Sequence, residues 1–159
     1  MSQSDDKCLF CMIVKGTIPS FKVYETKHSL AFLDISPVSE GHTQVIPKCK
    51  GTDWDRIFWR ILNYRPDHAV TIADLPDEYL ADIGPVVKKV ALATGASAYN
   101  VLQNNGKIAF QHVDHVHYHV IPKTSEKDGL ILDINVSWPQ KKAEKEELAA
   151  TLEKMKARI

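Results

Sequence analysis

Three histidines at alternate positions near the C-terminal third of the chain limit most strongly how it can fold. His115, His117 and His119 are separated by one apolar and one aromatic residue, and the run Val-Ile-Pro follows them. This alternation has the period of a strand with one buried side, so the three rings should project from the same face. At about 3.3 Å per residue the row spans about 13 Å, which is enough to surround a phosphate group.

Three interpretations of the histidine row are open from the residues alone. The first is a solvated strand face without chemistry, although three of the chain's seven histidines fall within five positions. The second is a metal site, because neutral imidazole is the commonest metal ligand in proteins. The third is phosphoryl-group chemistry, since an imidazole with a pKa of about 6.5 is largely neutral at pH 7 and can attack phosphorus. We favour the third.

Several motifs, in order along the chain, resemble the histidine triad family of nucleotide-binding proteins. Beside the triad itself, the matching stretches are Cys8 to Cys11, Ile18 to Glu25, Ala31 to Pro37, Gly41-His42, Val45 to Lys48, Asn104 to Gly106, and Gln111. Together they cover about residues 7–50 and 72–124. The combination is far more specific than the histidine pattern alone.

The length of 159 residues suits one domain with a core of its own, since a domain of this size buries about 70% of its unfolded surface. The most economical fold is α+β, with about five antiparallel strands and helices packed on one side. Strands are expected near residues 22–25, 29–33, 42–47 and 98–103, besides the histidine strand. The resemblance implies the same fold, and also a two-fold homodimer.

Two segments depart from the family pattern. Residues 51–71 form an insertion in which apolar residues at helical spacing predict an amphipathic helix of about three turns with no part in catalysis. These residues are Trp54, Ile57, Phe58, Ile61 and Leu62. A charged helix is expected from about residue 140 to 158, to which we assign no chemistry. Another helix should begin at Pro76, with acidic residues in its first turn.

Charge and composition argue against several classes of partner. Twenty basic and twenty acidic residues cancel, so no general attraction to nucleic acid or to an anionic membrane is expected. No apolar run approaches 18 residues, and the first six residues lack an apolar signal segment. Three cysteines, an odd number, argue against a disulfide framework and fit a reducing compartment. We expect a cytoplasmic protein, with the nucleus as a further location that the sequence leaves open.

The family resemblance implies a catalytic role for four side chains. His117 would attack the α-phosphorus of an adenosine 5′-phosphoramidate or a related purine nucleotide, and water would hydrolyse the nucleotidyl-histidine. His119 and Gln111 would bind phosphate oxygens and help the amine depart, and His42 would lie beside the triad. No organic cofactor is implied. Two alternatives stay open: a dinucleoside polyphosphate hydrolase, and a regulator that binds nucleotide without turnover.

The resemblance also implies how an AMP-like ligand is held. Asp34 would accept hydrogen bonds from the ribose hydroxyls, Phe32 and Ile35 would flank the base, and Asn104 would lie at the sugar or α-phosphate. From the residues alone, an acidic side chain at the end of an apolar run is as often a turn former. A carboxylate has enough lone pairs for a cis-diol.

Cys8 and Cys11 form half of a zinc-binding pattern. Their spacing suits two thiolates on one zinc ion, but a tetrahedral structural site needs two more ligands. The resemblance implies His115 as the third ligand and, as the fourth, a histidine where this chain has Lys50. A protonated lysine is a poor ligand, so such a site would have three ligands unless Cys49 joined them. Two thiols without a metal are the alternative.

Overall fold

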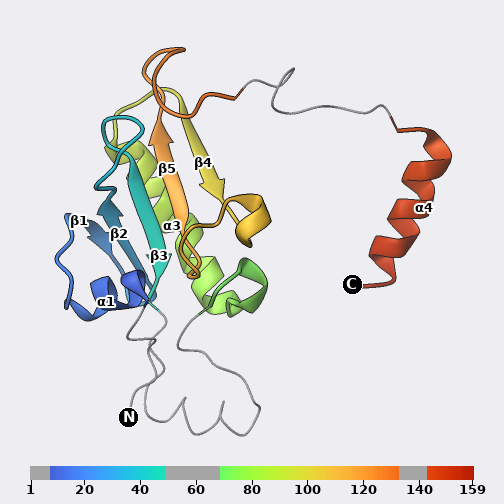
Figure 1. Cartoon of the computed structure of the whole chain (residues 1–159), viewed down its shortest axis with the longest axis horizontal. Coiled ribbons are helices and arrows are strands. Elements are labelled where there is room, and N and C mark those ends of the chain that lie inside the picture. Colours follow the sequence, from blue (N-terminus) through green and yellow to red (C-terminus); the bar gives the residue numbers. More distant parts are fainter. Residues whose placement is uncertain (1–7, 49–68, 133–142) are drawn as a thin grey trace, which may run out of the picture.

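The computed structural model of the chain describes residues 8–48, 69–132 and 143–159. Its centre is a five-stranded antiparallel sheet in the order β1-β2-β3-β5-β4 (Figure 1). The strands are β1 (Lys22–Glu25), β2 (Ser29–Leu33), β3 (Thr43–Pro47), β4 (Tyr99–Gln103) and β5 (Tyr118–Pro122). The predicted α+β fold with five antiparallel strands is confirmed. Strand β5, which contains His119, lies between β3 and β4.

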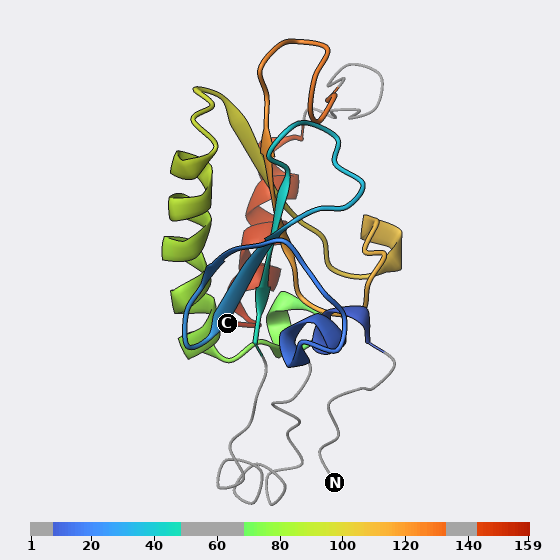
Figure 2. The same cartoon turned by 90° about the vertical axis from the view of Figure 1, so that its left-hand side faces the viewer.

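Three α-helices accompany the sheet in the described part of the chain. They are α1 (Leu9–Lys15), α3 (Asp77–Ala93) and α4 (Lys145–Lys156). Helix α3 begins just after Pro76, and Asp77 and Glu78 in its first turn complement the positive end of the helix dipole. Figure 2 shows α3 along one side of the sheet and α1 on the other side. The sheet therefore has two different faces, of which the α1 face matters for the site.

Alternation along the strands divides the core between these two faces. One cluster of buried residues joins the sheet to α3 and includes Ala31, Val45, Val120, Ile83, Val86 and Val90. A second cluster joins the sheet to α1 and consists of Cys8, Phe10, Cys11, Leu30, Phe32 and Ile46. Because Val120 points toward α3, its neighbours His119 and Ile121 point toward the α1 face. The histidines thus lie on the face that the N-terminal segment covers.

The structure describes only part of the predicted insertion and part of the predicted C-terminal helix. The apolar stripe of the insertion, within residues 54–62, lies outside them. Where the chain is described again, Ala69 is buried and its carbonyl accepts a hydrogen bond of 2.9 Å from the Val116 N–H. Helix α4 confirms helical structure over Lys145–Lys156, and none of its side chains is buried. No helix among the described residues combines the length and apolarity needed to cross a bilayer.

The packing of α3 on the sheet generates a stability prediction. Ile83 is 1% exposed within the α3 cluster, whereas Leu92, on the same helix, is 72% exposed. Ile83→Ala should lower the free energy of unfolding by about 2–5 kcal/mol, because it leaves a cavity under the sheet. Leu92→Ala should change it by less than about 0.5 kcal/mol. Urea unfolding of both variants measures the difference, and equal effects would contradict this description of the core.

Candidate active site

The three histidine rings lie together on the α1 face, as their spacing predicts. Strand β5 begins only at Tyr118, so His115 and His117 belong to the segment that leads into it. The Phe10 ring of α1 meets His115 and His117 edge to face, at centroid distances of 5.8 and 5.2 Å. The rings of His117 and His119 are 5.0 Å apart. His115 and His117 are buried, and His119 is partly exposed.

The hydrogen bond of His117 fixes which of its nitrogens is free to react. Its Nδ1 lies 2.6 Å from the backbone carbonyl oxygen of His115, which can only accept, so Nδ1 carries the proton. In a neutral imidazole the other nitrogen, Nε2, then holds a lone pair. Burial lowers the pKa of His117 below its ordinary value, which keeps the ring neutral. Nε2 of His117 is therefore a neutral imidazole nitrogen with an available lone pair.

His119 has the opposite tautomer because its partner is another imidazole. The N–H of Val38 donates to His42 Nδ1 at 3.4 Å, so His42 carries its proton on Nε2. That nitrogen lies 2.9 Å from His119 Nδ1 and donates to it. The remaining nitrogen of His119, Nε2, must then carry a proton and act as a donor.

Burial also controls the charge of the hydrogen-bonded pair His42 and His119. Burial lowers the pKa of His119 to about 4, with further contributions from the neighbouring His117 and His42 rings. Burial likewise lowers the pKa of His42, against the opposing effect of Asp34. Both rings are neutral near pH 7 in the ligand-free protein. An anion placed beside them would favour a proton on the pair.

Asp34 lies next to this histidine pair and is held on both oxygens. Oδ1 accepts a hydrogen bond of 2.7 Å from the Ser36 N–H, and Oδ2 accepts one of 2.5 Å from the Gln44 side-chain amide. Oδ2 is 3.8 Å from His42 Nδ1. Burial alone would raise the pKa of Asp34, but the Gln44 and Ser36 hydrogen bonds hold it below its ordinary value. The carboxylate is thus ionised and fixed in direction.

Gln44 is a site residue that the sequence did not single out. It stands two residues after His42 and pairs in register with Phe32 on β2 and with His119 on β5. The only signal in the sequence is this spacing from His42, which puts both side chains on one face of β3. Phe10, between the two cysteines, was missed in the same way.

Asp34, His42 and His119 bring potential metal-ligand atoms within 4.8 Å of one another. Two nitrogens on one tetrahedral zinc ion, each at about 2.0–2.1 Å from it, lie about 3.3–3.4 Å apart. The His42 and His119 nitrogens are only 2.9 Å apart, which is a hydrogen-bond distance. This group is a hydrogen-bonded chain rather than a metal centre.

Cys8, Cys11 and His115 form a different group that fits zinc well. His115 Nε2 donates to the Pro47 carbonyl oxygen at 3.1 Å, so the lone pair of Nδ1 faces the two sulfurs. Each sulfur lies 3.6 Å from Nδ1. Sulfur and nitrogen ligands of one tetrahedral zinc ion lie about 3.5–3.6 Å apart, given their usual bond lengths. All three residues are buried, and positions 49 and 50 lie outside the described residues.

The predicted contacts Gln111 and Asn104 both brace one loop. The Gln111 side chain is 3% exposed; its amide donates to the carbonyls of Val70 and Val113, at 2.6 and 3.0 Å, and its oxygen accepts from the Gly106 N–H at 2.6 Å. The Asn104 amide donates to the Phe110 carbonyl at 3.3 Å. Gln111 thereby fixes the backbone of the segment that runs into the triad.

The two predicted base contacts differ in exposure. Phe32 is buried, with its ring edge to face against Phe10 at 5.8 Å. Ile35 is 86% exposed, just beyond Asp34 at the end of β2. An apolar side chain this exposed, beside a fixed carboxylate, is available to a ligand. Phe32 forms part of the wall under the site.

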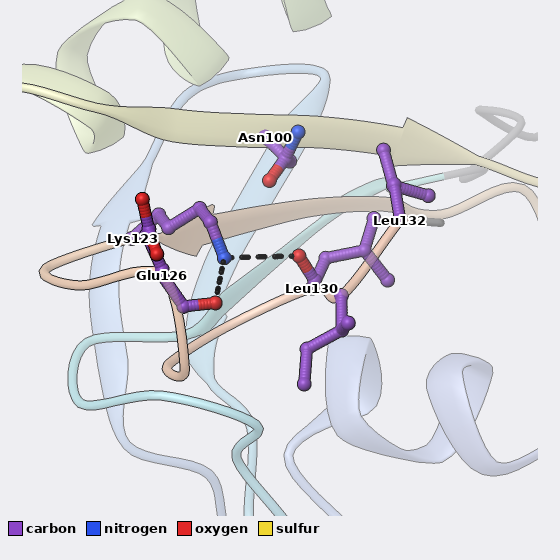
Figure 3. A pocket seen from close by; sticks show the side chains of 6 residues that line it. Asn100, Lys123, Glu126, Leu130 and Leu132 are labelled. Atoms are coloured by element: carbon purple, nitrogen blue, oxygen red, sulfur yellow. Dashed lines mark hydrogen bonds between the residues drawn. The ribbon is translucent and has the colours of Figure 1, made fainter. Parts of the chain in front are cut away.

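A separate hollow of about 260 Å³ lies beyond the far end of β5, where Lys123 and Glu126 face Asn100 and residues 130–132 (Figure 3). The Lys123 ammonium donates to the backbone carbonyls of Glu126, Asp128 and Leu130, at 3.2, 2.9 and 3.3 Å. All three of its donors are therefore used to shape the following loop. The hollow includes no member of the triad.

Comparisons with known proteins agree with this geometry. The family described as the HIT domain matches residues 15–126. An adenosine 5′-monophosphoramidase of Saccharomyces cerevisiae is 44% identical over 98% of this chain and 84% of its own length. The crystal structure of a histidine triad nucleotide-binding protein from Candida albicans has a TM-score of 0.77 at 40% identity, covering 96% of both chains. A zinc-bound histidine triad family protein from Mycobacterium smegmatis has a TM-score of 0.60 at 30% identity, covering 96% of this chain and 98% of its own.

The hydrogen-bond partners predict opposite tautomers for adjacent rings in the ligand-free protein. Long-range nitrogen–proton NMR spectra at pH 7 should show the proton of His117 on Nδ1 and that of His119 on Nε2. Because burial opposes its charged form, His119 should stay neutral as the pH falls and should titrate only near pH 4. Titration of His119 near its ordinary value of about 6.5, or the same tautomer for both rings, would contradict this description.

Proposed function

This chain belongs to the HIT domain family, and on that basis we propose that it is a nucleotide phosphoramidase that hydrolyses adenosine 5′-phosphoramidates and related purine nucleotides. The observation that carries the proposal is the pair of neighbouring rings, 5.0 Å apart, whose hydrogen-bond partners assign opposite tautomers, so that one ring offers a lone pair and the other a proton. Cleavage of a P–N bond needs both, because phosphorus must be attacked and the departing nitrogen must be protonated.

In the proposed reaction, His117 Nε2 attacks the α-phosphorus and forms a nucleotidyl-histidine. The P–N bond to the amine breaks, its electron pair goes to the nitrogen, and His119 supplies the proton. Water then attacks phosphorus and releases AMP. Imidazole and backbone donors stabilise the charge on the phosphate oxygens, and the buried contacts of Gln111 keep the adjacent loop backbone in place for this.

We propose that the nucleoside lies beyond the end of β2, with Asp34 at the ribose hydroxyls and Ile35 against the base. The exposure of Ile35 and the fixed direction of the Asp34 carboxylate support this placement. Phe32 supports the base pocket from beneath, and Asn104 acts at the α-phosphate side through the loop that it braces.

Replacing the nucleophile tests the proposed function. His117→Ala should lower the turnover of adenosine 5′-phosphoramidate by a factor on the order of 10⁴ or more, because no covalent intermediate can form. The variant should still bind AMP, which calorimetry measures and which shows that the fold is intact. Acid quenching should trap labelled nucleotide on the wild type and not on the variant. An adduct that forms at the wild-type rate in the variant would refute the assignment.

We further propose that the chain is a single domain that forms a two-fold homodimer, with residues 51–71 as an insertion. Strand β4 lies at one edge of the sheet and exposes Tyr99 and Val101. An apolar sheet edge of this kind favours pairing with another chain.

We propose a structural zinc ion at Cys8, Cys11 and His115. The supporting observation is the agreement between the observed S···N distances of 3.6 Å and those of a tetrahedral site. When bound, zinc would join the N-terminal segment to the residue that precedes the nucleophile. Its contribution would be to folding, since ligands that are far apart in the sequence are held by one ion.

Cys8→Ser should remove zinc from the purified protein, as measured by elemental analysis, and should lower the midpoint of thermal unfolding. The decrease should exceed the roughly 2–4 °C that corresponds to 1 kcal/mol in a domain of this size. A chelator should lower the wild-type midpoint toward that of the variant and leave the variant unchanged. Equal zinc content in the two proteins, or a chelator effect on both, would contradict the proposed site.

A further inference from the structure

We propose that Asp34 and Gln44 are positioning residues for a proton relay that runs from Asp34 through His42 to His119. The inference rests on the proposed function, because the relay serves the departure of the amine. It adds two residues to the chemistry of the site: Gln44, which no motif marks, and Asp34, whose implied role is confined to the ribose.

The relay crosses three adjacent strands on one face of the sheet. Asp34 follows β2, His42 precedes β3, and His119 lies in β5. The ladder between β2 and β3 continues past their ends, since the Asp34 N–H donates to the His42 carbonyl at 2.9 Å. The backbone therefore holds the two side chains beside each other. His119 lies diagonally opposite His42 across β3 and β5, and the 2.9 Å contact between His42 Nε2 and His119 Nδ1 completes the relay.

Gln44 controls the direction of the carboxylate. Its amide donates to Asp34 Oδ2, the same oxygen that lies 3.8 Å from His42 Nδ1. The Ser36 N–H holds the other oxygen. The Gln44 side-chain oxygen is buried and makes no hydrogen bond in the described part of the chain, so the contact with Asp34 is the one that orients this amide. Gln44 thus keeps the negative charge facing His42.

The geometry specifies where a proton goes when an anionic substrate binds. The hydrogen bond from Val38 to His42 Nδ1 is long, at 3.4 Å, so a solvent proton can replace it on that nitrogen. The resulting imidazolium faces Asp34, and the carboxylate stabilises its charge at close range. His42 then carries protons on both nitrogens, while His119 keeps its proton on Nε2.

The first chemical step consumes the outer proton of the relay. The bond from His117 Nε2 to phosphorus forms and the P–N bond to the amine breaks, leaving its electron pair on nitrogen. That nitrogen takes the proton from His119 Nε2, and His119 Nδ1 takes the proton from His42 Nε2. His42 ends neutral, with its remaining proton on Nδ1 beside Asp34.

The second step restores the relay without another residue. His119 now has a lone pair on Nε2 and can accept a proton from the water that attacks phosphorus. The bond from phosphorus to His117 breaks, and its electron pair returns to His117 Nε2. His119 passes its Nδ1 proton back to His42. One water is consumed, and one amine and one AMP are released, so the same ring acts first as acid and then as base.

Two substrate changes separate this role from ribose binding and from a structural role. An alkylamine phosphoramidate needs a proton on its leaving group, whereas a p-nitrophenyl ester of AMP does not. The 2′,3′-dideoxy form of each substrate lacks the hydroxyls that Asp34 would otherwise bind. We would measure the rate of formation of nucleotidyl-His117 in single turnovers, by rapid quenching, for all four compounds.

With the dideoxy alkylamine substrate, Asp34→Asn and Gln44→Leu should each lower the single-turnover rate by about 10–100-fold, as expected for residues that orient a catalytic group. His119→Ala should show the same selectivity with a larger loss, of about 10²–10⁴-fold. With the dideoxy nitrophenyl substrate, which lacks the hydroxyls that Asp34 would bind, Asp34→Asn and Gln44→Leu should both keep a single-turnover rate close to that of the wild type. Glu40→Gln makes the same chemical change as Asp34→Asn at an exposed position near His42 and should behave as the wild type with every substrate.

Equal losses with both leaving groups, or losses that vanish in the dideoxy substrates, would overturn the relay. The proposed function would survive either result, because the wild type would still form nucleotidyl-His117. If the wild type forms no adduct with any of the four compounds, the proposed function fails and the relay fails with it. Asp34→Asn and Gln44→Leu alter the relay at two points, so loss of folding in one leaves the other to decide.

Discussion

The hydrogen bond from His117 Nδ1 to the carbonyl of His115 is the contact on which the rest of the site depends. It leaves the lone pair on Nε2, and it exists only because the backbone of residues 115–117 is held in place. The His115 N–H donates to the Val113 carbonyl at 2.8 Å, and the Val116 N–H donates to the Ala69 carbonyl at 2.9 Å. The tautomer of His117 is therefore determined by the backbone contacts beneath it.

Neighbouring histidines acquire different properties here because the sheet gives each a different partner. A carbonyl can only accept, so it places the proton of His117 on the bonded nitrogen. Another imidazole can donate, so it places the proton of His119 on the distant nitrogen. One residue type thus supplies a lone pair and an N–H donor on two rings whose centroids are 5.0 Å apart.

The sequence predicted the features that depend on local periodicity, and it missed those that depend on strand register. Alternation placed the three rings on one face, and the motifs identified the α+β fold with its five antiparallel strands. The start of β5 at Tyr118, the contact of Phe10 with the rings, and the place of Gln44 depend on which residues oppose each other across strands. A one-residue change of register would have put Gln44 on the α3 face.

His115 belongs to two groups through two different parts of the residue. Its ring faces Cys8 and Cys11, and its backbone carbonyl holds His117. The carbonyl is positioned by the neighbouring peptide hydrogen bonds, so movement of this backbone is one route by which a metal ion at the sulfurs would affect His117. The Phe10 ring, packed against both imidazoles, is the second route by which a change at the cysteines would reach the site. Two residues of the segment that leads into β5 thus take part in different groups, His115 through its ring beside the cysteines and His117 through its hydrogen bond to the His115 carbonyl.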